Sequence, residues 1–452
     1  MKKKFWVALV LITGPLFGEQ AEFLSAVFQG ESARAISLWK KGGLTLGADE
    51  RGVTALGLAC QNGESELVAF LLEQGASPDE ESVGEQPLLI ASRTGSLACV
   101  SALLDKGAQV NVSGRGAQTP LMWAAAKGHS EVVSLLLEKG AKAEKTLESG
   151  FDALMFAVRA GRRGVVEVLL ESGLDVEKAY SPKQSRGGKM RQGTSPLMLA
   201  VENGHLEMAM ELVQRGANPN DLRSGVAPLH ALTWVRKAVR GDGVDGIPPP
   251  FIVGEMGSLD FVRHLVKAGA DVNLRLTKGS GGGGGRVQRK GQTPFFMAAA
   301  SGDLPLAKVL LELGADPEVN NAEGTTPFLA AVGLGILAPG EEQSLEDEAI
   351  AMGRFLLELG ADVNHVDQNG ETAMHGAAYK ASPKVMVFLD ENGADIAIWN
   401  QENRYKWTPL LITQGFRPGN FRPIQYSEEA MATIMRSHGV VPPKSPPPPN
   451  PK

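Results

Sequence analysis

Histidine and cysteine are the residue types in this sequence that could bind a metal ion, but their spacing does not support that chemistry. Structural zinc sites use paired ligands such as CxxC, and zinc proteases carry HExxH on a helix; neither pattern occurs. The two cysteines, Cys60 and Cys99, fall in apolar stretches typical of helix faces, so we expect buried thiols, although export would permit a disulfide. The seven histidines are His129, His205, His230, His264, His365, His375 and His438.

Sequence patterns that would mark a catalytic or phosphate-binding site do not occur either. There is no GxSxG sequence and no GxxxxGK[ST] loop. The glycine run 281–285 formally contains GxGxxG, but it neither follows a buried strand nor begins a helix. The sequence therefore predicts no enzymatic activity, no cofactor and no metal site. An enzyme whose site is hidden in the longer loops is the least favoured alternative.

Binding chemistry is more evident, because basic residues gather in two short segments of an acidic chain whose formal net charge is −6. The first segment, 177–191, holds Lys178, Lys183, Arg186, Lys189 and Arg191 against the single acidic residue Glu177. The second segment, 274–290, holds Arg275, Lys278, Arg286, Arg289 and Lys290 and no acidic residue. Concentrated positive charge attracts an acidic partner and speeds its association. The opposing interpretation is that these residues only keep flexible loops soluble.

The elements that would position these segments follow from an internal repeat. Glycine followed by Ala or Leu recurs at Gly75, Gly107, Gly140, Gly173, Gly216, Gly269, Gly314, Gly360 and Gly393. The intervals are 32, 33, 33, 43, 53, 45, 46 and 33 residues, so the basic period is 33 and four intervals carry insertions. A period of this size predicts a solenoid of stacked supersecondary units, in which each unit covers the apolar face of its neighbour.

The stretch 119–141 is the clearest copy of the repeat. Thr119 and Pro120 begin a short helix, since Pro is tolerated at a first helical position. Gly128 ends that helix, and a second helix follows with apolar residues at helical spacing up to Gly140, which is a C-terminal cap. Each repeat is therefore expected to be a pair of antiparallel helices.

The chain resembles the ankyrin-repeat family in its consensus motifs. These are Gly291-Gln292-Thr293-Pro294, Gly324-Thr325-Thr326-Pro327 and the GADVN sequences at 269–273 and 360–364. The resemblance implies an all-α ankyrin-repeat solenoid with β-turn fingers. It also implies that the fourth position of the Thr-Pro-Leu-His motif, which His230 and His375 occupy, makes local or inter-repeat hydrogen bonds.

The repeat pattern divides the chain into five parts. These are a signal peptide at 1–18, a capping repeat at 19–48, about nine clear repeats at 49–396, a degenerate capping repeat at 397–440 and a proline-rich tail at 441–452. Insertions are expected at 177–191, 235–257, 274–290 and 333–348. The first and third of these lengthen β-turn fingers, whereas the other two separate the helices of one repeat. The fourth is acidic, with Glu341, Glu342, Glu346, Asp347 and Glu348.

The position six residues after the Thr-Pro-Leu-His proline is expected to be exposed in the concave groove of the solenoid. Arg93, Arg159, Trp234 and Tyr379 are its basic or aromatic candidates for partner binding. Trp and Arg are common at the centres of protein interfaces. For Trp234 the alternative is that the ring packs beneath the insertion that begins at Val235.

The N-terminus predicts export. Lys2, Lys3 and Lys4 precede the apolar run 5–12, which is the arrangement of a secretory signal peptide, with cleavage expected after Gly18. The run is too short for a transmembrane helix, which needs about 20 apolar residues. The sequences WTPLL at 407–411, HGAAYK at 375–380 and RPGNFRP at 417–423 resemble a group of exported bacterial ankyrin proteins, which implies a periplasmic or extracellular location.

These patterns together predict a non-enzymatic, exported, monomeric scaffold that binds an acidic protein through its groove and basic fingers. The alternative is a binder of anionic polysaccharide or of a membrane surface. The acidic net charge gives no reason to expect a nucleic-acid partner.

Overall fold

The computed structural model describes residues 18–182, 191–237, 239–241, 243–247, 249–279, 286–336, 339, 344–417 and 423–443. The predicted signal peptide, apart from Gly18, lies outside the described residues, as do residues 444–452 of the tail. The chain divides into two compact units, residues 1–192 (unit 1) and 193–452 (unit 2). In the part of the chain that the structure describes, no helix is long and apolar enough to cross a membrane.

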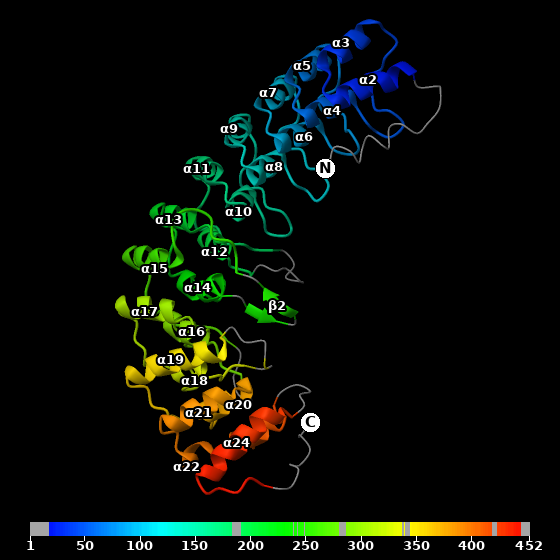
Figure 1. Ribbon diagram of the computed structural model, residues 1–452. Coiled ribbons are helices and arrows are strands. Elements are labelled where there is room, and N and C mark those ends of the chain that lie inside the picture. The colour runs from blue at the N-terminus through cyan, green and yellow to red at the C-terminus, as the bar shows by residue number, and fades with distance from the viewer. Residues whose placement is uncertain are drawn as a thin grey trace. The chain divides into compact units, whose positions relative to one another are not determined.

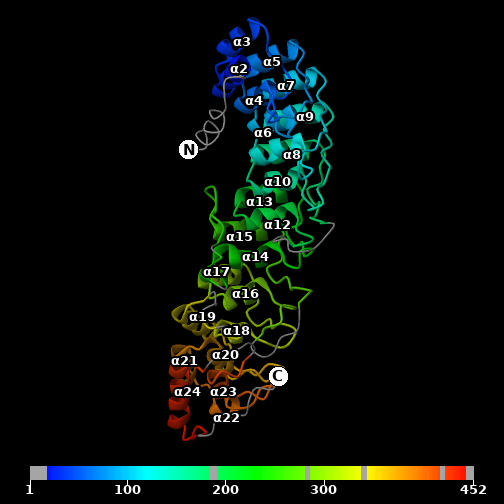
Figure 2. The same ribbon diagram turned by 90° about the vertical axis from the view of Figure 1, so that its right-hand side faces the viewer.

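Unit 1 is a stack of helix pairs (Figure 1). Its helices are α2 (Gly18–Gln29), α3 (Ser32–Lys40), α4 (Ala55–Asn62), α5 (Ser65–Glu73), α6 (Pro87–Thr94), α7 (Leu97–Asp105), α8 (Pro120–Lys127), α9 (Ser130–Glu138), α10 (Ala153–Arg159) and α11 (Arg163–Glu171). The first helices of successive pairs pack on one another to form an inner row, and the second helices form an outer row (Figure 2).

Unit 2 continues the same two-row pattern. Its helices are α12 (Pro196–Glu202), α13 (Leu206–Gln214), α14 (Pro228–Arg236), α15 (Ser258–Lys267), α16 (Pro294–Ala300), α17 (Leu304–Glu312), α18 (Pro327–Ala331), α19 (Glu346–Glu358), α20 (Ala373–Lys380), α21 (Pro383–Glu391), α22 (Ile396–Trp399), α23 (Pro409–Thr413) and α24 (Gln425–Ser437). The final helix, α24, packs on α21 and α23 and covers the last pair. The predicted all-α repeat solenoid is confirmed.

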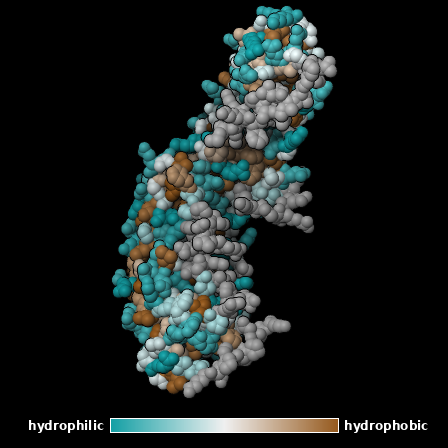
Figure 3. All heavy atoms as spheres, turned by 45° about the vertical axis from the view of Figure 1, so that its right-hand side comes forward, coloured by the Kyte–Doolittle hydropathy of each residue, from teal (hydrophilic) through white to brown (hydrophobic). Residues whose placement is uncertain are grey.

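The local signals in the clearest repeat form as expected. The Thr119 hydroxyl accepts a hydrogen bond from the Met122 amide and so satisfies one of the free N–H groups at the start of α8. Gly128 ends α8 with φ of 91°, a left-handed conformation that costs a residue with a Cβ about 1 kcal/mol or more. The apolar faces of α8 and α9 are buried, so the hydrophobic effect holds the helix pair to its neighbours. On the face shown in Figure 3, hydrophobic residues stand in small groups among hydrophilic ones.

The Asn of the repeat joins one outer helix to the next. The amide of Asn364 donates to the Gly393 carbonyl at 3.0 Å, while its side-chain oxygen accepts from the Asp395 amide at 2.8 Å. Asn111, Asn220 and Asn273 make the same pair of bonds at their own repeats. The Asn in the repeat sequence therefore fixes the spacing of the stack, because it satisfies a helix-end carbonyl of the next repeat.

The insertions add a hairpin that the sequence did not predict. Strands β1 (Val239–Gly241) and β2 (Gly243–Ile247) pair antiparallel within 235–257, and Figure 1 shows β2 beside α14. The segment that returns from the hairpin lies against the turn before α13, where the Val253 amide donates to the Gly204 carbonyl at 3.3 Å.

The acidic residues at the end of the fourth insertion are not in a loop. Glu346, Asp347 and Glu348 form the first turn of α19, where negative charge is stabilised by the helix dipole. Their position corrects the expectation of an acidic loop through residue 348. Glu341 and Glu342 lie outside the described residues.

The buried histidines and cysteines have structural roles. The His230 ring lies 3.4 Å from the Gln292 carbonyl and the His375 ring lies 3.2 Å from the Trp407 carbonyl, which confirms their predicted inter-repeat hydrogen bonds. Burial lowers the pKa of each imidazole to about 4, so both are neutral near pH 7. Cys60 and Cys99 are both buried and free, as expected, and burial raises the pKa of each thiol.

Candidate partner-binding site

Arg93 and Trp123 form the first part of the candidate site, on the inner row of unit 1. The guanidinium of Arg93 lies over the Trp123 ring, 5.2 Å from its centroid. Both Arg93 terminal nitrogens also donate to the carboxylate of Glu85, the second at 2.8 Å. The Arg93 side chain is 33% exposed, so it remains accessible while its orientation is fixed from two sides. A planar guanidinium held over an aromatic ring is typical of interface anchors.

Arg159 makes a similar arrangement two repeats later. Its guanidinium lies 4.7 Å from the centroid of Phe151 and 5.5 Å from that of Phe156. The two rings are themselves in contact, with centroids 5.0 Å apart. Arg159 is exposed and Phe156 is half-buried. The predicted site residues Arg93 and Arg159 therefore both lie beside aromatic rings, in the "arginine–aromatic row" formed by Arg93, Trp123, Phe156 and Arg159.

Sequence reasoning missed the aromatic members of this row. Trp123 and Phe156 lie three residues before the position, six after the Thr-Pro-Leu-His proline, that is predicted to be exposed. Because residues three apart are neighbours on a helix surface, the Phe156 ring meets Arg159 of the same helix, whereas the Trp123 ring meets Arg93 of the preceding repeat. An aromatic residue followed three positions later by a basic residue was therefore a sequence signal for Phe156 and Arg159 but not for Trp123.

Tyr379 corrects the predicted site, because it is completely buried. Its hydroxyl donates to Glu371 at 3.2 Å and accepts from the Asn403 amide at 3.2 Å. Arg417, which is 1% exposed, donates to the Tyr379 backbone carbonyl at 2.9 Å. Burial, followed by the neighbouring Glu371 charge, raises the pKa of the Tyr379 hydroxyl, and burial lowers that of Arg417. The last repeat therefore covers this position, and Tyr379 cannot act as an exposed anchor.

This buried cluster unites three sequence motifs. Tyr379 belongs to HGAAYK, Arg417 belongs to RPGNFRP, and the carbonyl of Trp407 in WTPLL receives the His375 contact. The described residues of the three motifs thus meet in one place, at the last repeats of the solenoid.

Trp234 is predicted either to bind a partner or to pack beneath the insertion that begins at Val235. It lies on α14 and is half-buried, between the fully buried Thr233 and Val235. It belongs to unit 2, whereas the arginine–aromatic row belongs to unit 1. The role of Trp234 in partner binding therefore stays a prediction.

The second basic finger has an anchored base and exposed charges. The Leu276 amide donates to the Gln292 carbonyl at 3.0 Å, the Gly291 amide donates to the Leu276 carbonyl at 2.7 Å, and the Leu276 side chain is 1% exposed. Arg275 donates to the Asn320 carbonyl of the next finger at 2.8 Å. All five predicted residues are exposed: Arg275, Lys278, Arg286, Arg289 and Lys290.

The first basic finger is described only in part. Lys183, Arg186 and Lys189 lie outside the described residues. Arg191 is half-buried, and Lys178 pairs with Asp152 at 2.8 Å. The two fingers therefore differ, because the described cations of the first are half-buried whereas all five of the second are exposed, including Arg275, which also bonds to the next finger.

Within the described residues, no three His, Cys, Asp or Glu side chains are grouped so that they could hold a metal ion. Glu371 and Tyr379 form a hydrogen-bonded titratable pair at 3.2 Å, but both are 1% exposed or less; His438 and Asp390 lie 2.6 Å apart and are partly exposed. The exposed groups of the candidate site are guanidinium groups, ammonium groups and aromatic rings, which suit the recognition of a partner.

Profiles of known families identify the class of protein. Profiles described as "Ankyrin repeats (3 copies)" match residues 24–114 and 113–180, one described as "Ankyrin repeat" matches 192–223, and one described as "Ankyrin repeats (many copies)" matches 295–334 and 345–389. Together these matches cover more than half of the chain, which belongs to the ankyrin-repeat family.

Similar proteins come from animals and a virus. The chain is 29% identical over 194 residues to the mouse protein "Ankyrin repeat and SOCS box protein 10", a match covering 40% of this chain and 39% of that protein. It is 29% identical over 154 residues to mouse "Neurogenic locus notch homolog protein 1", covering 34% of this chain and 5% of that protein. It thus spans less than half the length of either relative.

A viral relative and a solved structure extend the comparison. The fowlpox virus "Putative ankyrin repeat protein FPV230" is 26% identical over 217 residues, which cover 48% of this chain and 89% of the viral protein. The crystal structure of the human ASB11 ankyrin repeat domain has a TM-score of 0.44 and 23% identity, and the match covers 58% of this chain and 98% of that domain.

Proposed function

We propose that this protein is an exported, non-enzymatic interaction scaffold that binds an acidic protein partner. The observation that carries the proposal is the second basic finger. Its five cations are all exposed, and no acidic residue lies among them, in a chain whose net charge is −6. Charge separated in this way attracts anionic surfaces over a distance of about 8 Å at physiological salt.

The arginine–aromatic row would contribute more binding free energy per residue than the exposed cations of the finger, because its side chains are already ordered. Arg93 and Arg159 are held against aromatic rings, so binding orders little additional side-chain freedom. Trp123 offers apolar area beside a positive charge, which suits a partner with acidic and apolar residues close together. A stacked solenoid adds little ordering cost of its own, because its surface is already formed. We expect the protein to act as a monomer.

The export part of the proposal rests on sequence alone. Lys2, Lys3 and Lys4 before the apolar run 5–12 have the arrangement of a secretory signal. We propose a periplasmic or extracellular location, as the resemblance to exported bacterial proteins implies. Fractionation of cells that express the full chain, followed by mass measurement of the mature N-terminus, tests both the location and cleavage after Gly18.

The test of partner binding compares two variants with equal charge change. In the finger variant, Arg275, Lys278, Arg286, Arg289 and Lys290 become Gln. In the control variant, the exposed residues Lys40, Lys41, Lys106, Lys267 and Arg436, all at ends of outer helices or of the last helix, become Gln. Affinity capture from envelope extract, read by mass spectrometry, should recover the same acidic proteins with the native chain and the control. The finger variant should lose them.

The same variants discriminate the alternative of an anionic polymer or a membrane surface. Binding to dextran sulfate or to anionic vesicles, with steep salt dependence and no effect of Trp123→Ala, would favour that alternative. Loss of protein capture in Trp123→Ala, with the fold retained by circular dichroism, would favour a protein partner. Equal capture by the finger variant and the native chain would remove the proposed site.

A further inference from the structure

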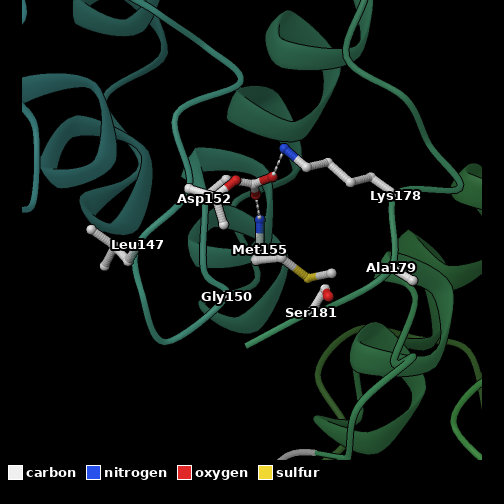
Figure 4. A pocket seen from close by; sticks show the side chains of 8 residues that line it. Leu147, Gly150, Asp152, Met155, Lys178, Ala179 and Ser181 are labelled. Atoms are coloured by element: carbon white, nitrogen blue, oxygen red, sulfur yellow. Dashed lines mark hydrogen bonds and ion pairs between the residues drawn. The ribbon is translucent and has the colours of Figure 1, made fainter. Parts of the chain in front are cut away.

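A cavity of about 250 Å³ lies between two consecutive fingers of unit 1 (Figure 4). Leu147, Gly150, Asp152 and Met155 line it from one finger and the helix that follows, and Lys178 and Ser181 line it from the next finger. In Figure 4 the Lys178 ammonium reaches across to Asp152, while the side chains of Met155 and Ser181 lie below that pair. The wall is therefore partly charged and partly apolar.

Asp152 departs from the repeat at this position. The residue that caps the inner helix is uncharged in the other repeats: Thr54, Gln86, Thr119, Ser195, Ala227, Thr293, Thr326, Thr372 and Thr408. Asp152 caps α10 in the same way, since it accepts from the Met155 amide at 2.9 Å. Capping alone does not require a buried carboxylate, because Thr caps equally well elsewhere in the chain. The negative charge of Asp152 is therefore not explained by helix capping.

Lys178 forms an ion pair with Asp152. Its ammonium lies 2.8 Å from the second oxygen of Asp152, which is 1% exposed, and 3.4 Å from the Glu144 carbonyl. An ammonium group has three N–H donors and a carboxylate oxygen has two lone pairs. Among the described contacts, Lys178 therefore keeps one donor and Asp152 keeps acceptor capacity, side by side on the cavity wall.

The wall beside Met155 and Gly150 is apolar, whereas Thr146 and Ser181 add polar groups. Met155 is 2% exposed, and a Cβ on Gly150 would lie 2.8 Å from the Tyr180 ring, so the backbone and that ring are in close contact. Tyr180 also packs edge-on against Phe151, with centroids 5.8 Å apart. A ligand group that enters can place an apolar stem against Met155 and a polar end at the ion pair.

We propose that this cavity binds a carboxamide, with Lys178 donating to its oxygen and Asp152 accepting from its amino group. The ion pair is neutral overall. A carboxylate ligand would place a second negative charge beside the buried Asp152, and a cation would meet the Lys178 ammonium, so both are disfavoured. A carboxamide adds no charge and presents one acceptor and two donors together. The site is independent of the proposed acidic partner, and a side chain of Asn or Gln or a free amino acid could supply the group.

Methyl NMR of the full chain tests the site directly. The Met155 methyl, assigned by Met155→Leu, reports ligands at the cavity wall. The ligands are the N-acetyl methylamides of Gln, Asn, Glu and Leu, and free L-glutamine. We expect saturable shifts with the Gln or Asn derivative, and binding weaker by about tenfold or more with the Glu and Leu derivatives. A difference of about tenfold between capped and free glutamine would identify the source as a side chain or as a free amino acid.

Two variants provide the decisive control. Asp152→Thr restores the usual capping residue, so the fold should persist while carboxamide binding falls by about tenfold or more. Asp105→Thr removes an exposed carboxylate elsewhere in unit 1 and should leave binding unchanged. The proposal is overturned if the Met155 methyl shows no saturable shift, if the Gln and Glu derivatives bind equally, or if Asp152→Thr binds as the native chain does.

Discussion

Units 1 and 2 are built from the same repeat but join neighbouring repeats at their helix turns by different chemistry. In unit 1 the described contacts include hydrogen bonds from uncharged side chains to backbone carbonyls, such as Thr94 to Cys60 at 3.0 Å and Asn62 to Val27 at 2.8 Å. In unit 2 the Arg236 guanidinium pairs with Asp303 at 2.7 Å, and their side chains are only 16% and 3% exposed.

The difference follows from the insertions. In unit 1 the bonded residues are 34 and 35 positions apart, close to the repeat length. In unit 2, Arg236 and Asp303 are 67 residues apart, and Lys237 and Glu348, which pair at 2.8 Å, are 111 apart. Where an insertion separates the helices of a repeat, ion pairs between distant residues hold the turns together. We infer that unit 2 depends more strongly on charge than unit 1.

The largest expected effect is the loss of Arg236. Arg236→Met leaves the Asp303 carboxylate buried without its partner, which should lower the free energy of unfolding of unit 2 by about 3–5 kcal/mol. The matched change in unit 1, Thr94→Val, removes a neutral hydroxyl that bonds to the Cys60 and Ile90 carbonyls and should cost about 1 kcal/mol. Hydrogen exchange of the amides of α17 and α7, followed by mass spectrometry, measures each effect locally.

A double variant separates charge from packing. Adding Asp303→Asn to Arg236→Met removes the unpaired charge and keeps a side chain that can cap α17, so most of the lost stability should return. If Arg236→Met costs no more than Thr94→Val, the contrast between the units is wrong.

Acid should destabilise unit 2 through its buried imidazoles. His230 and His375 have a pKa near 4 in the folded chain, against about 6.5 when unfolded. Below pH 6.5 the unfolded state binds protons that the folded state does not, so stability falls as the pH falls from 7 toward 4. We expect a loss of about 2 kcal/mol for each histidine at pH 5, measured by urea unfolding. In the His230→Gln, His375→Gln double variant, stability should depend much less on pH between 7 and 4. An unchanged pH dependence in that variant would contradict this cause.

A smaller effect is expected at the buried cluster of the last repeats. Tyr379→Phe removes the hydrogen bonds to Glu371 and Asn403 and should cost about 1–3 kcal/mol in unfolding free energy. Partner capture should not change, since the side chain is buried. By contrast, Trp123→Ala in unit 1 should reduce capture with little loss of stability. Reduced capture by a folded Tyr379→Phe protein would restore Tyr379 as a site residue.

The smallest effect is common to both units. Ala117 in unit 1 and Lys406 in unit 2 have φ of 64° and 65° at the finger position where most repeats carry Gly. Substitution by Gly relieves a left-handed strain that exceeds the entropy Gly adds to the unfolded chain, so each variant should gain about 0.5 kcal/mol. Thermal unfolding checks this, and a loss of stability in either variant would show that the side chain contributes contacts of its own.

The sequence by itself determined the repeat and most of its local structure. Thr119, Pro120 and Gly128 act within a few residues of their own positions, so their effects can be read without knowing the fold. The 33-residue period then places each helix pair against the next one. The segregation of basic residues in 274–290 was also evident, because charge needs no packing to be recognised.

Tertiary structure alone decided which side chains are exposed at interrupted positions. Tyr379 occupies a position that is exposed or half-buried in most of the other repeats, but the altered last repeat brings Asn403 and Arg417 over it. The ion pair of Asp152 with Lys178 joins residues 26 positions apart, and that of Arg236 with Asp303 spans two insertions. Such contacts depend on where an inserted chain returns to the stack, which no local propensity or period specifies.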